Sequence, residues 1–176
     1  DSIYMIKTLR SKYPELRLVA FTVDNGFNSP ISEGNISKVC RQYEIEHLQI
    51  RAPQIFNKLY RFGFENFSSK GFFATDILGG ELIQDLGRNV AAQMKIPLMV
   101  IGYTPQQISN INSECDGYDL YDETRAIRKD CQKFTRIQYC GIDLKGTFDE
   151  SEMHYWWDFS RYEEDVPTMI FPFCAW

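Results

Sequence analysis

Hydrophobic positions along the chain follow two alternating patterns, short apolar runs and stripes repeated every three to four residues. The clearest run covers residues 16–27, which are apolar for most of their length and then break into Asp-Asn-Gly. A short apolar run bounded by turn residues is typical of a strand that is buried on both faces. Residues 46–50 and 97–102 are two further strand candidates, and the first is more polar and therefore nearer to a sheet edge.

Helical stripes separate these strands. Apolar side chains recur at helical spacing in residues 1–13, 28–43, 53–66 and 76–95. In the last stripe they occupy every fourth position, namely Leu78, Leu82, Leu86, Val90 and Met94. In the third stripe we expect these side chains to face inward: Ile55, Phe56, Leu59 and Phe62. Alternation of helices with strands indicates parallel α/β units rather than an antiparallel sheet.

The alternation weakens beyond residue 107. Residues 122–138 and 150–162 are helix candidates, and residues 166–173 are a terminal strand candidate interrupted by two prolines. The second helix candidate carries a Tyr-Trp-Trp cluster that closes the core or a subunit interface, or offers a platform for a sugar. The chain therefore divides into an α/β core, residues 1–110, and a mostly helical, aromatic-rich extension of the same domain, residues 111–176.

The first helical stripe begins at residue 1, and no strand candidate comes before it. A doubly wound sheet normally leads into such a helix from a central strand. We therefore expect the sequence to be a fragment that starts just after that strand.

Charge and cysteine content narrow the classes of partner and compartment. The chain has 19 Lys and Arg against 24 Asp and Glu, a net charge of −5, whereas proteins that bind a phosphate backbone usually carry a basic surface. Nucleic acid is therefore a disfavoured partner. The five cysteines form no CxxC pair, which argues against a zinc ribbon and favours a reduced, cytoplasmic protein. No apolar run reaches the ~20 residues that a membrane span needs.

Three features would meet at one edge of a parallel sheet and form a nucleotide pocket. The free N–H groups at the start of the first helix suit a phosphate, to which Ser2 could donate a hydroxyl. Asp1 could hold Mg²⁺ there, although the spacing alone favours a helix cap as the role of both residues. Two strand ends each supply a glycine, Gly26 and Gly102. A flat ring could lie against either glycine, or the glycine could serve only to permit a turn or close packing. The candidate binding residues are Asp1, Ser2, Thr22, Val23, Asp24, Asn25, Gly26, Ile101, Gly102 and Tyr103, with Asp1 as the metal ligand.

These residues also carry a family resemblance. Asp1-Ser2 ahead of an apolar helix resembles the end of the SGGxDS signature of the PP-loop ATP pyrophosphatases. Residues 22–27, with Asn35-Ile36 downstream, and residues 91–103 are similar to the N-acetyl sugar amidotransferase branch of that superfamily, which is known from surface-polysaccharide pathways. The similarity covers residues 1–107.

The resemblance implies a Rossmann-like fold of the HUP, or adenine nucleotide α-hydrolase-like, type: a parallel sheet with flanking helices, whose first strand is missing here. It also implies ATP and Mg²⁺ as cofactors. Asp1 and Ser2 would belong to the phosphate loop, residues 22–25 would line the adenosine, and Gly102 would lie against it. The implied enzyme adenylates a small, sugar-type acceptor and releases pyrophosphate, and ammonia from a glutaminase subunit then displaces AMP.

Two other functions stay open. One is a PP-loop tRNA thiolase, in which Cys115, Cys131 or Cys140 relays sulfur. The other is a non-catalytic nucleotide-binding or interaction domain. A homo-oligomer also stays open, and His47 and His154 are expected to have surface or packing roles because two distant histidines form no metal site by themselves.

Overall fold

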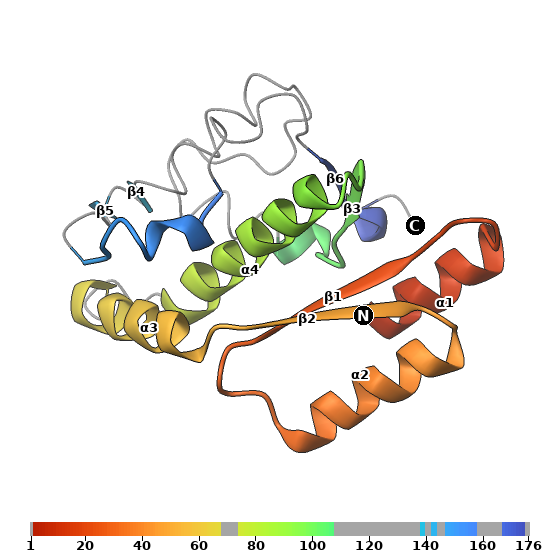
Figure 1. Ribbon diagram of the computed structural model, residues 1–176, viewed down its shortest axis with the longest axis horizontal. Coiled ribbons are helices and arrows are strands. Elements are labelled where there is room, and N and C mark those ends of the chain that lie inside the picture. Colours follow the sequence, from red (N-terminus) through yellow and green to blue (C-terminus); the bar gives the residue numbers. More distant parts are fainter. Residues whose placement is uncertain are drawn as a thin grey trace. The chain divides into compact units, whose positions relative to one another are not determined.

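The computed structural model describes residues 2–67, 74–107, 138–139, 142–143, 147–157 and 167–174 (Figure 1). The protein has mixed α/β structure with short parallel strands and flanking helices. It divides into two compact units, residues 1–61 and residues 62–176. The domain boundary suggested by the sequence, near residue 110, lies outside the described residues.

The first unit has the predicted order of helices and strands. Its elements are α1 (Ser2–Lys12), β1 (Val19–Asp24), α2 (Pro30–Gln42), β2 (Glu46–Arg51) and the first part of α3 (Pro53–Phe67). The start of α2 follows from its sequence, because the Ser29 hydroxyl accepts a hydrogen bond from the Ser32 N–H at 3.1 Å and Pro30 occupies the first turn. All four side chains expected to face inward from α3 are buried.

Strands β1 and β2 pair in parallel, from Val19 opposite Glu46 to Asp24 opposite Arg51, and Figure 1 shows α2 running beside them. Of β1, only Val23 and Asp24 are buried, so the expectation of burial on both faces holds only at its end. The rest is half-buried, because among the described residues β1 pairs on one edge alone. Strand β2 has no buried residue, as its polar sequence predicted.

The parallel register gives the strand pair one apolar and one polar face, since directly paired residues share a face. The mainly apolar face carries Val19, Phe21 and Val23 of β1 with Leu48 and Ile50 of β2, and Glu46 lies at its start. The mainly polar face carries Ala20, Thr22 and Asp24 of β1 with His47, Gln49 and Arg51 of β2. Functional groups of two strands therefore gather on one side.

A single side chain of α1 links the loops at the opposite end of this unit. The Arg10 guanidinium donates to the carbonyl oxygens of Leu16, Tyr43 and Glu44 at 2.8, 3.2 and 3.3 Å. These acceptors lie in the loops before β1 and before β2. Helix α1 is thereby tied to both strand entries.

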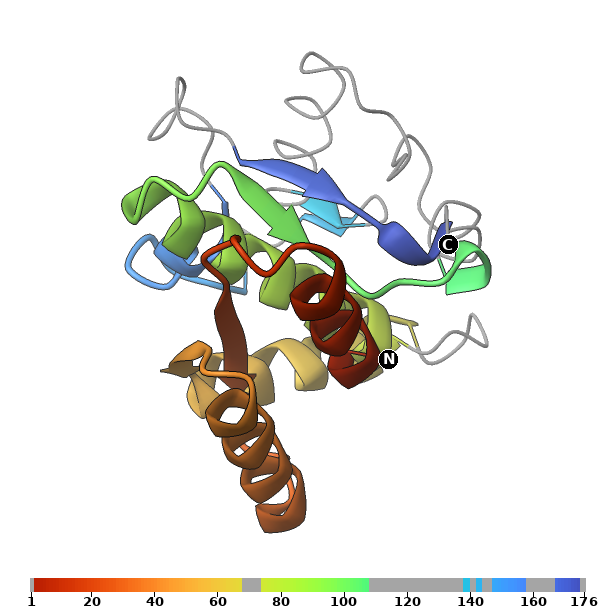
Figure 2. The same cartoon turned by 90° about the vertical axis from the view of Figure 1, so that its right-hand side faces the viewer.

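The second unit is built around α4 (Ala74–Gln93) and strands that pair across long stretches of sequence. Strand β3 (Leu98–Val100) pairs in parallel with β6 (Thr168–Ile170), as Figure 2 shows. The remaining elements are β4 (Gln138–Tyr139) antiparallel to β5 (Ile142–Asp143), η2 (Met153–Tyr155) and η4 (Pro172–Cys174). The prediction of a terminal strand is confirmed, because its two prolines flank β6 instead of interrupting it.

Helix α4 confirms the first part of the predicted apolar stripe and contradicts the last. Leu78, Leu82 and Leu86 are at most 4% exposed, whereas Met94 is 43% exposed. A strict spacing of four residues advances by about 40° per step around a helix of 3.6 residues per turn. The stripe therefore rotates away from the core, and Ala91 and Ala92 are buried in its place.

The helix expected over residues 150–162 is wrong in its described part. Only η2 forms there, and Trp156 has extended backbone with φ −78° and ψ 155°. The Asn89 side-chain amide donates to the carbonyl oxygens of Tyr155 and Trp156 at 3.2 and 3.4 Å. Trp156 and Trp157 are buried, so the cluster belongs to the core. Of the other helix expected in this region, only Gln138 is described, and it lies in β4.

None of the described helices is long and apolar enough to cross a membrane.

Strand β3 is shorter than predicted, and its first residue, Leu98, is 43% exposed.

The burial of α4 generates a test of the packing. Leu82 is 0% exposed and its neighbour Ile83 is 36% exposed. We expect L82A to reduce the free energy of unfolding by about 2–5 kcal/mol, since it removes buried methyl groups and leaves a cavity. I83A is the matched control and should cost much less. Urea unfolding followed by circular dichroism measures both, and equal losses would contradict the orientation of α4.

Candidate functional site

The turn after β1 is held by its own side chains. The Gly26 N–H donates to Asp24 Oδ1 at 2.9 Å, and the Phe27 N–H donates to Asn25 Oδ1 at 3.0 Å. Two Asx turns therefore follow each other. Gly26 has φ +87°, and a Cβ atom there would lie 2.9 Å from Pro53 Cβ. Glycine is needed at this position both for its conformation and for the close approach of α3.

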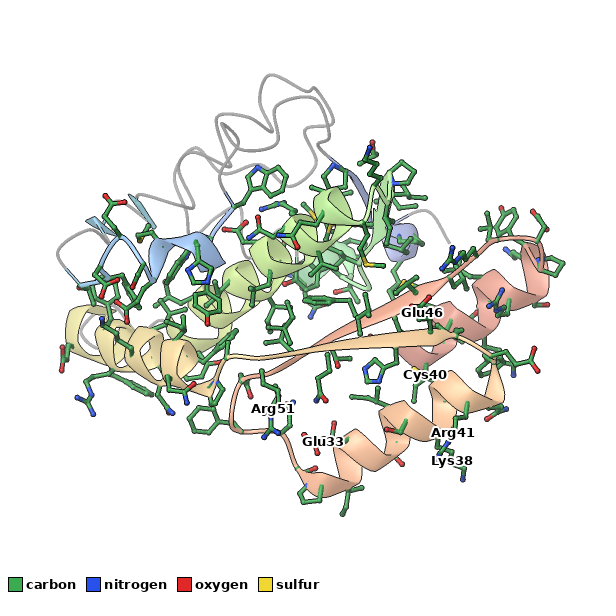
Figure 3. The ribbon with its side chains drawn as sticks, viewed as in Figure 1. Glu33, Lys38, Cys40, Arg41, Glu46 and Arg51 are labelled. Atoms are coloured by element: carbon green, nitrogen blue, oxygen red, sulfur yellow. The ribbon has the colours of Figure 1, made fainter. Side chains whose placement is uncertain are left out.

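Asp24 also joins the ends of the two strands. Its carbonyl oxygen accepts from the Ala52 N–H at 3.0 Å, and its Oδ2 accepts from Arg51 Nε at 2.9 Å. Asp24 is buried, with both carboxylate oxygens engaged, while the Arg51 side chain is 77% exposed. The arginine is labelled at the end of β2 in Figure 3. Asp24 thus fixes the turn and orients Arg51, and Arg51 is the group of this pair that a ligand can reach.

Aromatic rings of α3 support the other side of the turn. Asn25 Nδ2 donates to the Tyr60 hydroxyl at 3.3 Å. The Tyr60 ring lies 5.5 Å from the Phe27 ring and 5.8 Å from the Phe56 ring, between centroids. Phe56 is fully buried and Phe27 is 63% exposed, so the three rings lead from the core to the surface.

The remaining residues of this segment also have partners within the protein. The Thr22 hydroxyl and His47 Nε2 share a hydrogen bond of 2.8 Å, which agrees with a packing role for this histidine. The Val23 carbonyl oxygen accepts from Asn28 Nδ2 at 3.1 Å. Of the residues predicted to line a nucleotide, those from Thr22 to Gly26 therefore form the end of β1 and the start of the turn that follows it, held by hydrogen bonds within the protein.

The second predicted strand end lies in the other unit. The Ile101 N–H donates to the Ile170 carbonyl oxygen at 3.0 Å and continues the pairing of β3 with β6. The Tyr103 hydroxyl accepts from Gln84 Nε2 at 3.2 Å, and its ring stacks on Phe171 at 6.1 Å between centroids. Gly102 between them is half-buried. The Tyr103 side chain is thereby anchored on α4 and beside η4.

The structure brings Thr22 to Gly26 together and, separately, Ile101 to Tyr103. Their meeting in one pocket stays a prediction, because they belong to different compact units. Ser2 lies exposed at the start of α1, as expected, and Asp1 is outside the described residues. No group of three or more potential metal ligands occurs within the described part of the chain.

Sequence reasoning missed three residues of this site. Phe27 follows the Asp-Asn-Gly break directly, Arg51 ends β2, and Tyr60 comes from α3. Aligning the ends of two parallel strands would have found Arg51, because it pairs with Asp24. Nothing in the local pattern marks Tyr60, whose contact depends on how α3 returns to the turn.

Other potentially reactive side chains lie elsewhere and are less suited to take part in a reaction. A hollow of about 450 Å³ between the end of α2 and the start of β2 includes Cys40, Arg41 and Glu46, labelled in Figure 3. Burial raises the pKa of the Cys40 thiol, which keeps it protonated at neutral pH and weakens it as a nucleophile. Cys115, Cys131 and Cys140 lie outside the described residues.

A buried ion pair joins Asp85 to Arg88 one turn later on α4. His154, within η2, is exposed, and its Nδ1 contacts the Ser151 carbonyl oxygen.

The backbone of the turn generates a second test. We expect G26A to reduce the free energy of unfolding by roughly 1–3 kcal/mol, because alanine is strained at positive φ and would press on Pro53. G34A is the matched control: Gly34 lies inside α2 with open space around its Cβ direction, so alanine should stabilise by about 0.5–1 kcal/mol. Thermal unfolding distinguishes the two signs, and a stabilising G26A would show that the turn has another conformation.

No family model, curated protein or solved structure matches this chain.

Proposed function

We propose that this protein is an ATP-dependent PP-loop enzyme of the amidotransferase type. It adenylates a small acceptor, an N-acetyl sugar, for attack by ammonia. The observation that supports this most strongly is the polar turn from Asp24 to Phe27 at the carboxyl end of β1, within a parallel β1–α2–β2 unit. In open parallel sheets, ligands bind outside the carboxyl ends of the strands.

The proposed reaction has two steps. An oxygen of the acceptor attacks the α-phosphorus of ATP, the bond between the α-phosphorus and the bridging oxygen breaks, and pyrophosphate leaves. Ammonia then attacks the activated carbon, and AMP leaves with the acceptor oxygen. Positioning and electrostatic stabilisation supply most of such catalysis, since the protein forms no covalent bond to the substrate.

The resemblance assigns the phosphates of ATP to the start of α1. Ser2 is exposed there, where it can donate its hydroxyl beside the free N–H groups of the first turn. Asp1 would hold Mg²⁺, which offsets the charge of the departing pyrophosphate. The turn after β1 would bound the adenosine.

Pyrophosphate exchange tests the reaction. We expect labelled pyrophosphate to enter ATP only when an N-acetyl sugar acceptor is present. The reason is that pyrophosphate re-forms ATP by reacting with the acceptor adenylate. Cleavage of ATP to ADP and phosphate would remove the family assignment. A tRNA that copurifies and is required for exchange would favour a thiolase, and nucleotide binding without exchange for any acceptor would favour a non-catalytic domain.

The phosphate end of the site has its own test. We expect S2A to weaken ATP binding roughly tenfold, since a hydrogen bond to a charged group is lost. S11A is the matched control, because Ser11 is exposed in the last turn of the same helix. Calorimetric titration with ATP and Mg²⁺ measures both, and equal affinities for S2A and S11A would show that the phosphates bind elsewhere.

A further inference from the structure

We propose that Phe27, Tyr60 and Arg51 form a separate binding site for a sugar ring that carries an anionic group. The site takes the acceptor, which is therefore an acidic sugar or a sugar phosphate rather than a neutral sugar. This inference rests on the proposed function for the ligand's role as acceptor, but its chemistry comes from the three side chains themselves.

The exposed ring of Phe27 is held by the turn that carries it and by one neighbouring ring. Its backbone N–H is bound by Asn25 Oδ1, and the preceding glycine sets the direction of the turn. Its ring packs on Tyr60 at an interplanar angle of 48°, and 63% of the residue stays exposed. A ring held in this way loses little conformational entropy when a ligand packs on it. The apolar face of a sugar ring suits such a surface.

Tyr60 stabilises the orientation of the Phe27 ring by packing against it. Its own ring contacts the buried Phe56, and its hydroxyl accepts a hydrogen bond from Asn25. The two contacts hold Tyr60 from the core and from the turn at once. Phe27 therefore rests on a partner that is itself fixed.

Arg51 supplies the anion contact. Its Nε is bound by Asp24 Oδ2, its side chain is 77% exposed, and that bond is its one side-chain partner among the described residues. The terminal nitrogens of the guanidinium are thereby oriented and open to solvent. A guanidinium binds carboxylates and phosphates through two parallel hydrogen bonds, which gives both affinity and geometry.

The turn joins the two contacts into one site. Asp24 holds Arg51 and the Gly26 N–H, and the next residue, Asn25, holds Tyr60 and the Phe27 N–H. Ring and cation are thus fixed by adjacent residues at the carboxyl end of the β1–β2 pair. A ligand that uses both needs a ring and a negative charge in the same molecule.

Calorimetry without ATP tests the site independently of adenylation. The probes are N-acetylglucosamine, N-acetylglucosamine 1-phosphate and glucuronate, which are neutral, phosphorylated and carboxylated. We expect one or both anionic probes to bind roughly 10- to 100-fold more tightly than the neutral sugar. The preferred anion then distinguishes a sugar phosphate from a sugar acid. Equal affinities for all three probes, or no binding by any of them, would overturn the proposal.

Variants assign the preference to its side chains. R51Q should remove the preference for the anionic probe and leave the affinity for the neutral sugar unchanged. R51K keeps the positive charge beside Asp24 but lacks the paired nitrogens of the guanidinium, so it should retain part of the preference. F27A should weaken all probes by a similar factor, and F27W should restore them. R17Q and F64A are matched controls, because Arg17 is an exposed arginine paired with Glu46 and Phe64 is 64% exposed; neither should change binding.

The outcomes separate this site from the proposed reaction. A preference that survives both R51Q and R51K rejects the site, whatever the exchange assay shows. Intact, Arg51-dependent binding without acceptor-dependent exchange rejects the proposed reaction and keeps the site. Melting temperatures of each variant show whether a loss of binding reflects unfolding. If R51Q does not fold, an undiminished preference in R51K rejects the site and a reduced one supports it.

Discussion

The carboxylate of Asp24 is the interaction on which the first unit depends. One oxygen closes the turn through the Gly26 N–H, and the other holds Arg51, while the carbonyl oxygen of the same residue receives the Ala52 N–H. A single buried residue thus connects the end of β1, the end of β2 and the entry to α3. Since a buried carboxylate is stable only when its oxygens are bound, the turn and the carboxylate stabilise each other.

In the second unit, a side chain binds backbone carbonyl oxygens that backbone N–H groups would bind in a helix. Asn89, buried on α4, donates to the carbonyl oxygens of η2 and of the residue after it. These carbonyls would otherwise accept the i→i+4 bonds of a helix. The buried tryptophans beside them are therefore presented from a turn, and Phe148 packs on Trp156 at 4.8 Å between ring centroids.

The contrast between these two cases explains what could be predicted from the sequence. The start of α2 and the break after β1 could be predicted, because Ser29, Pro30 and Gly26 act on their immediate neighbours. The turn around Trp156 could not, since it depends on an asparagine 67 positions earlier in the chain. Likewise, Asp24 could be singled out from the sequence, but its binding of Arg51 depends on strand register. Exposure at Met94 follows from helix geometry and could have been anticipated from the spacing itself.

The position of Cys40 makes the attachment of α2 measurable in solution. It is the buried residue of α2, and the rest of that helix is exposed or half-buried, so few apolar contacts hold the helix against β2. Segments with little buried surface open locally at a lower free energy than the whole fold. A thiol that reacts only when α2 separates from the strand would report the frequency of that opening through its labelling rate. Cys40 is therefore a natural probe of local opening in the first unit, at the end of the β1–β2 pair remote from the Asp24 turn.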